Sequence, residues 1–180
     1  SAQDPTMLSK YQVRKPFVIY TGSAYPHKNI PQAAAAIKRI NQKGEMLSFV
    51  VASSRSVFLD RLSRTLQDEG SLRYVRFIGF VPDEDLTKLY SQAVALVQPS
   101  HSEGFGLTGL EAMAAGLPVL ASRSSVFQEI YQDAALYFDS QSKDDLETVL
   151  QTILNDGKLR RRLIRKGLQH AKQFSWKTLV

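Results

Sequence analysis

Short apolar runs alternate with helical patterns along the whole chain. Six runs are apolar at consecutive positions and are bounded by Gly, Pro or polar residues, as is typical of strands buried on both faces of a sheet. The predicted strands are Phe17–Tyr20, Leu47–Ala52, Val75–Ile78, Val94–Val97, Val119–Ala121 and Ala135–Phe138. Because parallel neighbours need a crossover connection, strands that alternate with helices predict a parallel sheet.

The segments between these strands carry apolar residues at helical spacing. One predicted helix follows Asn29, a suitable cap, and stops before Gly44; the next stops before Gly70. A later helix follows Ser142 with Asp145 three residues on, a pair that resembles a capping box. The pattern predicts an α/β fold: a Rossmann-like, doubly wound parallel six-stranded sheet with helices on both faces and strand order 3-2-1-4-5-6.

Composition places this sheet in one folded domain. Of the 180 residues, 43% are hydrophobic and 22% are charged, which is ordinary for a globular chain. Residues 1–15 are interpreted as a linker or lead-in, so the domain is expected to span residues 16–177. Glu111 and Pro118 interrupt the apolar stretch 104–122, so we expect no membrane-spanning helix there. The chain has no cysteine, which fits a reducing, cytoplasmic location.

The net charge of +6 comes from the C-terminal segment. Eight of the 23 Lys and Arg residues lie within 158–177, where no acidic residue occurs, whereas the first 157 residues carry 15 basic and 17 acidic residues. Apolar residues at helical spacing predict a helix here. Its outer face would expose Arg161, Arg162, Arg165 and Lys172. A solvated helix face and contact with an anionic membrane surface both fit this pattern.

Two loops at the carboxyl edge of the predicted sheet are candidates for a phosphate site. In a doubly wound sheet, ligands bind where the winding reverses, beyond strands 1 and 4. The loops after these strands, 21–29 and 99–106, each lead into a helix, whose N-terminus offers unpaired N–H groups to an anion. Lys28 adds a positive charge, and Gly104 and Gly106 allow close approach of the backbone.

Motifs of other nucleotide-binding folds are missing from these loops. The loop after strand 1 has Gly22 as its single glycine, so it does not match the dinucleotide fingerprint, and no P-loop motif occurs. Glu111 is the only charged residue within 104–122. On a helix it would share a face with Leu107 and Ala114, which predicts a shielded carboxylate that accepts hydrogen bonds. A structural role and a grip on sugar hydroxyls both fit this placement.

The residues around Glu111 carry a resemblance to a known family. The segment Glu103–Val119 resembles the E-x7-E segment of retaining glycosyltransferases of the GT-B fold, family 4, also called glycosyl transferase group 1. Further segments resemble family signatures in the family's order: Tyr25–Asn29, Gly79–Leu86, Leu89–Tyr90 and Phe174–Trp176. The resemblance implies that the predicted sheet is one half of a GT-B fold.

The resemblance also implies roles for individual residues. Glu103 would contact hydroxyls of the donor sugar, Lys28 the diphosphate and Glu111 the ribose, with Glu103 and Lys28 assigned as catalytic. The remaining donor-binding residues would be Gly22, Ser23, Val81, Gly104, Phe105, Gly106 and Leu107, with Phe80 beside Val81 at the nucleobase. Many family members have an arginine where this chain has Ser23, so a second charge on the phosphates is not expected from that position.

The resemblance covers only the C-terminal, donor-binding half of such enzymes, so we expect the acceptor domain to be absent from this chain. The full-length protein would be a hexosyltransferase of polysaccharide biosynthesis that uses a nucleotide-diphospho-sugar, GDP-mannose or a UDP-sugar, and a glycan or lipid-linked acceptor. The form of Tyr25–Asn29 resembles a mannosyltransferase branch and favours mannose. The isolated domain is expected to be inactive, and no cofactor or metal is expected.

Two other functions would use the same fold and site. A non-catalytic nucleotide-sugar-binding module and a GT-B nucleotide-sugar epimerase both stay open beside the transferase. Nucleic acid is not expected as a partner, because only Phe174 and Trp176 near the basic segment could stack on bases. The expected location is cytoplasmic, with peripheral contact to the inner face of the membrane through the basic segment as a further expectation.

Overall fold

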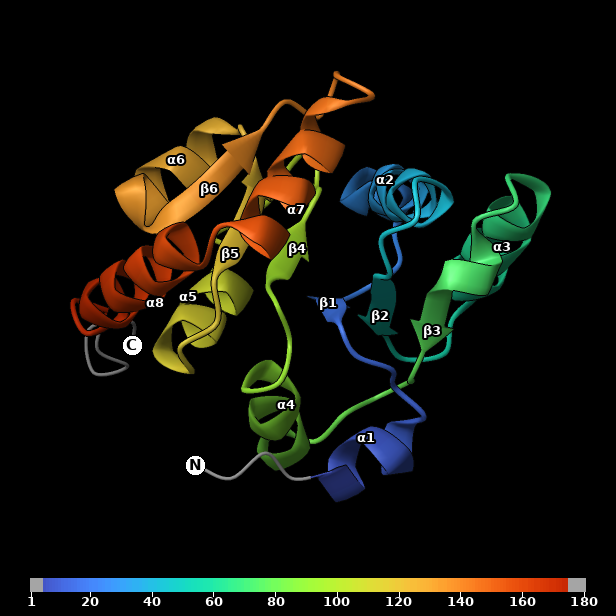
Figure 1. Cartoon of the computed structure of the whole chain (residues 1–180), viewed down its shortest axis with the longest axis horizontal. Coiled ribbons are helices and arrows are strands. Elements are labelled where there is room, and N and C mark those ends of the chain that lie inside the picture. The colour runs from blue at the N-terminus through green and yellow to red at the C-terminus, as the bar shows by residue number, and fades with distance from the viewer. Residues whose placement is uncertain (1–4, 175–180) are drawn as a thin grey trace.

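The computed structural model describes residues 5–174 as one sheet with the helices that connect its strands. The sheet is parallel and has the order β3-β2-β1-β4-β5-β6 (Figure 1), which confirms the predicted doubly wound topology. Its strands are β1 (Phe17–Thr21), β2 (Ser48–Ala52), β3 (Val75–Phe77), β4 (Leu96–Gln98), β5 (Val119–Ser122) and β6 (Ala135–Phe138). The predicted signature residues Ser175 and Trp176 and the predicted domain end at residue 177 lie outside the described residues.

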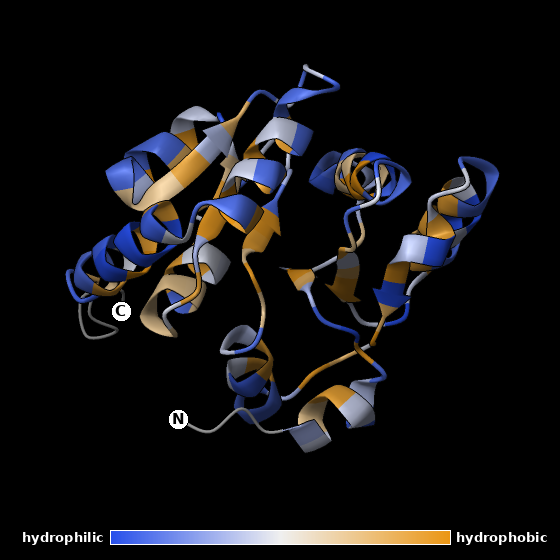
Figure 2. Cartoon of the chain, viewed as in Figure 1, coloured by the Kyte–Doolittle hydropathy of each residue, from blue (hydrophilic) through white to orange (hydrophobic). Residues whose placement is uncertain are grey.

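The inner strands β1, β2, β4 and β5 are buried between two apolar cores, whereas the edge strands β3 and β6 are partly exposed. In β1, Val18 and Tyr20 belong to one core and Phe17 and Ile19 to the other, and none of the four is more than 3% exposed. The strands are accordingly mostly orange in Figure 2, whereas the outer faces of the helices are blue. Burying a large apolar side chain stabilises a fold by roughly 1.5–3 kcal/mol, so this double burial accounts for the consecutive apolar positions in the sequence.

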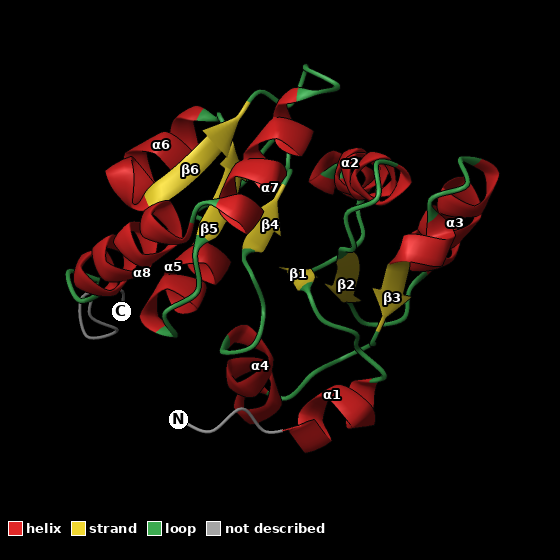
Figure 3. Cartoon of the chain, in the orientation of Figure 1, coloured by secondary structure: helices red, strands yellow, loops and turns green. Residues whose placement is uncertain are grey.

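Helices cover both faces of the sheet, as Figure 3 shows. One face carries α2 (Ile30–Gln42), α3 (Val57–Asp68) and α7 (Asp145–Asn155). The other carries α1 (Pro5–Tyr11), α4 (Asp83–Tyr90), α5 (Leu107–Ala114) and α6 (Ser125–Tyr131). The last helix, α8 (Gly157–Ala171), lies against α5 and also contacts α7. Short 3-10 turns are η1 (Pro26–Lys28), η2 (Leu72–Tyr74) and η3 (Gln132–Ala134).

Helix α1 occupies the segment assigned from the sequence to a linker or lead-in. Met7 is buried in the core below it. Asp85 of α4 accepts hydrogen bonds from Lys10 Nζ and from the Tyr11 hydroxyl, each at 2.6 Å. The bond from Lys10, followed by that from Tyr11, holds the pKa of Asp85 below its usual value. These contacts with a distant helix fix a segment whose own composition carries little apolar signal.

The start of α7 differs from the predicted capping box. Ser142 Oγ accepts a hydrogen bond from the Asp145 backbone N–H at 3.2 Å, as expected. The helix nevertheless begins at Asp145, after Asp144. The Asp145 carboxylate accepts its bond from the backbone N–H of Asp139, at 2.7 Å. The prediction of a reciprocal bond from the Ser142 backbone to Asp145 is therefore wrong, because the Asp145 carboxylate bonds to the loop after β6 instead.

Glu147 joins α7 to α2. Its side chain is only 6% exposed, and it accepts hydrogen bonds from Arg39 Nε at 2.6 Å and from Lys43 Nζ. Burial by itself would raise the pKa of Glu147, but the bonds from Lys43 and Arg39 outweigh it and hold this pKa below its usual value. The charged form of the carboxylate therefore stabilises the packing of α7 on α2.

We expect Glu147→Gln to lower the free energy of unfolding by about 1–3 kcal/mol at neutral pH, because bonds to a charged partner are lost. The folded-state pKa is depressed, so this contribution is present above the unfolded-state pKa and disappears as the pH falls through the folded-state pKa. Urea unfolding at neutral and acid pH should show a difference that shrinks in acid. Glu84→Gln is the control, since that side chain is 83% exposed beside Lys88; equal losses in both variants would contradict the assignment.

Candidate functional site

The loops after β1 and β4 meet at the carboxyl edge of the sheet, as the topology predicts. The backbone N–H of His101 donates to the carbonyl of His27 at 2.8 Å, which ties the two loops together. Lys28 Nζ lies 2.7 Å from Glu103 Oε1, and each of these side chains is 17% exposed. The fold thus brings the two residues assigned as catalytic into a partly shielded ion pair.

Two buried serines hold Glu103 in place, and the sequence analysis missed both. Ser100 Oγ donates to Glu103 Oε1 at 2.6 Å, and Ser122 Oγ donates to the carbonyl of Ser100 at 2.6 Å. Each serine is 1% exposed. The position of the two serines in the sequence could have indicated them. Ser122 ends β5 and Ser100 follows β4 closely, and a polar residue at the carboxyl end of a buried parallel strand lies at the edge where ligands bind.

A cavity of about 250 Å³ opens between the two loops. Of the predicted site residues, its lining includes Gly22, Lys28, Glu103, Phe105, Gly106 and Leu107. The residues that the sequence analysis did not assign are Tyr20, Thr21, Gln98, Ser100 and Thr108. Lys28 is the one cation in this lining, so an anionic group entering the cavity would meet its ammonium.

A second cavity, of about 200 Å³, adjoins the first through Thr21 and Gly22. Phe80 and Val81 line it, as the resemblance implied for the nucleobase wall, although Phe80 is 74% exposed and Val81 is buried. An elongated ligand could therefore reach from the Lys28–Glu103 pair across Gly22 to an apolar wall. Ser23, Gly104 and Glu111 line neither cavity.

The backbone at Gly22 and Ser23 is fixed by Tyr20. Gly22 has φ of +138°, and a Cβ at this position would lie 3.1 Å from the Tyr20 hydroxyl oxygen. That hydroxyl donates to the carbonyl of Ser23 at 2.6 Å. Only glycine fits such a backbone comfortably beside the ring. The fold therefore requires glycine at position 22, which also lines both cavities.

Tyr131 of α6 holds the glycine-rich start of α5. Gly106, the N-cap of α5, has φ of +77°, and its carbonyl accepts a hydrogen bond from the Tyr131 hydroxyl at 2.6 Å. The same hydroxyl lies 2.8 Å from Gln98 Oε1. A Cβ at Gly109 would overlap the Tyr131 ring and also lie 2.7 Å from Gln98 Oε1. The N–H groups at the start of α5 are therefore positioned by a residue far away in the sequence.

The sequence analysis gave Gly104 and Gly106 the same role, but the structure requires glycine at only one of these positions. Gly104 has no atom within 4 Å of an added Cβ and no positive φ, so the local structure does not require glycine there. Gly106 needs its positive φ and its closeness to Tyr131. Its place at the cavity wall also agrees with the expected close approach of a ligand.

Glu111 does not have the predicted shielded environment. It lies on the exposed side of α5, and within residues 5–174 its carboxylate makes no hydrogen bond or ion pair. It does share a face with Leu107 and Ala114, but these residues are themselves exposed, because α5 buries Leu110 and Met113 instead. Partial burial, with a smaller effect of the Asp83 carboxylate, raises the pKa of Glu111.

Three tyrosines around the cavities stay protonated at neutral pH. Burial raises the pKa of Tyr90 to about 12, with a smaller contribution from the Glu111 carboxylate, and its hydroxyl lies 3.2 Å from Thr21 Oγ1. Burial likewise raises the pKa of Tyr20 and Tyr131 far above the usual value. These hydroxyls therefore serve as neutral hydrogen-bonding groups that fix the loops.

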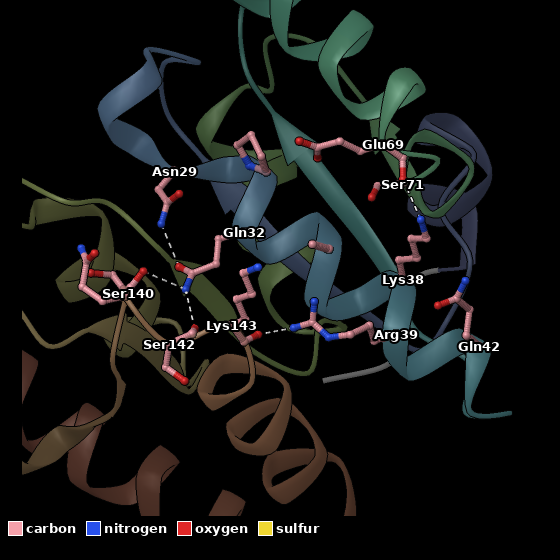
Figure 4. A pocket seen from close by; sticks show the side chains of 13 residues that line it. Asn29, Gln32, Lys38, Arg39, Gln42, Glu69, Ser71, Ser140, Ser142 and Lys143 are labelled. Atoms are coloured by element: carbon pink, nitrogen blue, oxygen red, sulfur yellow. Dashed lines mark hydrogen bonds between the residues drawn. The ribbon is translucent and has the colours of Figure 1, made fainter.

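A larger cavity, of about 620 Å³, lies along α2 and contains none of the predicted site residues (Figure 4). Gln32 Nε2 donates to the carbonyls of Ser140 and Ser142, each at 3.1 Å. Lys38 Nζ donates to the carbonyl of Glu69 at 2.6 Å. These polar groups are already engaged in joining α2 to its neighbours.

A metal site is not assembled in the described part of the chain. The sequence Asp83-Glu84-Asp85 has the spacing of an Asp-x-Asp motif, but Asp85 turns to Lys10 and Tyr11 of α1. Among residues 5–174, no three histidine or carboxylate side chains are grouped closely enough to hold one ion.

Comparison with known proteins identifies relatives over nearly the whole chain. Residues 9–170 match the family model described as glycosyl transferases group 1. O-antigen chain mannosyltransferase B of Escherichia coli is 35% identical over 172 residues, which are 94% of this chain and 45% of that protein. O-antigen chain mannosyltransferase RfbU of Salmonella typhimurium is 31% identical over 137 residues, 76% of this chain and 38% of that protein. The chain thus spans less than half the length of these relatives.

Solved structures share the fold. Sucrose-phosphate synthase from Thermosynechococcus elongatus superposes with a TM-score of 0.84 and 27% identity, over 98% of this chain and 46% of that one. The C-terminal domain of a glycosyl transferase group 1 family protein (LpcC) from Francisella tularensis superposes with a TM-score of 0.76 and 23% identity, over 96% of this chain and 93% of that one. The second likeness shows the fold alone.

We expect Gly109→Ala to destabilise the chain by roughly 1–3 kcal/mol or more, because the added methyl overlaps Tyr131 and Gln98 in a buried position. Gly104→Ala is the matched control and should change stability by less than about 0.5 kcal/mol, since its methyl meets open space. Thermal unfolding of the two variants measures the difference. Similar stability of both would show that Tyr131 does not hold the start of α5.

Proposed function

The chain belongs to the glycosyl transferases group 1 family, and we propose that it is the donor-binding half of a retaining glycosyltransferase. The transferred group would be a hexose, carried on a nucleotide-diphospho-sugar. The acceptor would be a glycan or a lipid-linked glycan bound by a further domain, since this chain corresponds to 45% of the mannosyltransferase from Escherichia coli. The chain alone would bind the donor but transfer nothing.

The Lys28–Glu103 pair at the reversal point of the sheet carries this proposal. The pair combines a cation, which suits a diphosphate, with a carboxylate, which suits sugar hydroxyls, at a separation of 2.7 Å. The apolar wall at Phe80 and Val81 lies on the other side of Gly22. This sequence of chemistries matches a sugar, a diphosphate and a nucleobase in that order.

Donor binding would exchange the partners of the ion pair. In the described structure Lys28 and Ser100 both bond to Glu103 Oε1. An incoming diphosphate would form an ion pair with the Lys28 ammonium in place of Glu103. The Glu103 carboxylate would keep its bond from Ser100 and could then accept hydrogen bonds from sugar hydroxyls. Phosphate binding and sugar binding would thereby be coupled through a single carboxylate.

The same groups would stabilise departure of the leaving group. The bond between the anomeric carbon and a phosphate oxygen breaks, and negative charge grows on the diphosphate. The oxygen of the acceptor hydroxyl bonds to the same carbon, and its proton passes to the released diphosphate. Lys28 and the N–H groups at the start of α5 are placed at the cavity wall, where fixed positive charge lowers the energy of such a transition state. Tyr131 would contribute by holding these N–H groups through Gly106.

Mannose is the donor sugar that the relatives favour. The names of the proteins from Escherichia coli and Salmonella typhimurium both state mannosyltransferase, at 35% and 31% identity. The form of Tyr25–Asn29, with Lys28 in the ion pair, points in the same direction by its resemblance. GDP-mannose is therefore the proposed donor, with a UDP-sugar as the competing one to be tested beside it.

Chemical-shift mapping tests the location of this site. GDP-mannose should perturb the backbone amides of loop 21–29, loop 99–106 and the segment at Phe80, because these line the adjoining cavities. Amides at the far end of the larger groove, at Lys38, Arg39 and Gln42, should stay unchanged and serve as the internal control. The same titration with UDP-sugars ranks the nucleobases. Shifts confined to the α2 groove, or absent from both loops at saturation, would overturn the proposal.

The two glutamates should separate when ligands with and without sugar are compared. We expect Glu103→Gln to weaken the binding of GDP-mannose by roughly ten- to a hundredfold, since hydrogen bonds to a charged group are lost. The binding of GDP should stay unchanged or become tighter, since Lys28 no longer pairs with a carboxylate. Glu111→Gln should weaken both ligands alike if Glu111 holds the ribose.

Isothermal titration of both variants with both ligands measures this division. Glu84→Gln is the control, because that exposed residue lies outside both cavities. Equal loss of GDP and GDP-mannose in Glu103→Gln would contradict the exchange of partners. Unchanged binding in Glu111→Gln would remove the ribose role and agree with the exposed position of that side chain.

A further inference from the structure

Helix α8 carries a continuous row of unpaired cations on its outer face. Lys158, Arg161, Arg162 and Arg165 of α8 and the C-cap residue Lys172 are all exposed, and their spacing of three, four and seven residues places them on one side of the helix axis. Within residues 5–174, none of the five forms an ion pair. We call this row the basic face. Figure 2 shows α8 as mainly hydrophilic.

Most of the opposite side of α8 packs against the fold, although Leu168 is 38% exposed. Leu163 is 4% exposed in the core. Gly167 approaches α5 so closely that an added Cβ would lie 3.1 Å from Met113 Cγ. His170 Nε2 lies 2.6 Å from the carbonyl of Ile130, to which its N–H donates. Apart from Leu168, the apolar stripe of α8 therefore faces the protein and not a bilayer.

The carboxylates bonded to α8 leave the basic face uncompensated. Asp156 caps the helix by accepting a bond from the Leu159 backbone N–H at 2.9 Å, and Asp133 pairs with Lys166 at 2.5 Å. Lys166 lies beside the row rather than in it. The first 157 residues carry 15 basic and 17 acidic residues, so the positive charge of the chain is concentrated on this one helix.

We propose that the basic face binds an anionic lipid surface by electrostatic attraction. Charge complementarity selects this partner: a row of long, unpaired cations suits many mobile phosphate groups, whereas a second copy of the chain would present the same charge and be repelled. No helix within residues 5–174 is both long and apolar enough to span a bilayer, so the contact is with the membrane surface. None of the five residues lines the two cavities of the donor site.

Sedimentation of the 180-residue chain with phosphatidylcholine vesicles, with and without phosphatidylglycerol, tests the proposal. Binding should require phosphatidylglycerol and disappear at high salt, because the screening length falls from about 10 Å at 0.1 M to about 3 Å at 1 M. The triple variant R161Q/R162Q/R165Q should bind about a hundredfold more weakly at low salt, since each surface cation contributes roughly fivefold.

The control variant R14Q/R64Q/R73Q removes the same net charge from exposed arginines outside α8 and should keep its binding to anionic vesicles. Circular dichroism checks that both triple variants fold. If R161Q/R162Q/R165Q does not fold, the single variant Arg162→Gln and the dependence of the unaltered chain on salt and on anionic lipid decide the question. No binding to anionic vesicles at low salt, equal binding to neutral vesicles, or equal losses in both triple variants would overturn the proposal. Binding of GDP-mannose is measured separately, so failure here leaves the donor site standing.

Discussion

The reversal of winding between β1 and β4 is the constraint on which the rest of the structure depends. Parallel strands must be connected by crossover helices of one hand, so a sheet that continues in both directions from β1 leaves two loops side by side at one point on its carboxyl edge. Lys28 and Glu103 occupy these two loops. Residues 75 positions apart in the sequence therefore meet because of the order of the strands.

The site is supported by polar groups buried behind it. Ser122 orients Ser100, Ser100 orients Glu103, and Tyr131 fixes the carbonyl of Gly106. The bonds from Ser122 and Tyr131 link the site to the next strand–helix unit of the sheet. Buried polar side chains of this kind stabilise a fold only when their partners are in place. The neighbouring unit β5–α6 thus contributes to the site without lining much of its surface.

Donor binding and membrane contact would use different parts of the same domain. The cavities open at the carboxyl edge between the loops after β1 and β4, whereas the basic face belongs to α8, which is anchored on α5 through Gly167 and Met113. Helix α5 therefore connects them: its N-terminus forms the cavity wall and its flank receives α8. A rigid α5 would hold the donor site at a fixed orientation to an adsorbed surface.

The sequence by itself determined the strands, their order and the meeting of the loops 21–29 and 99–106 at one edge of the sheet. Hydrophobic periodicity is local, and the handedness of crossovers converts it into one topology. The six strands, the stops at Gly44 and Gly70 and the site loops were all predictable for this reason. The E-x7-E resemblance supplied the family, which the match over residues 9–170 confirms.

Tertiary structure alone decided which faces are buried and which distant groups pair. Helical spacing placed Glu111 with Leu107 and Ala114, but only packing on the sheet shows that this shared face is exposed. The contacts of Tyr131 with Gly106, of Ser122 with Ser100 and of Asp85 with α1 join segments whose sequences carry no sign of one another. Such pairs arise from the three-dimensional meeting of separate elements, and a local pattern cannot encode them.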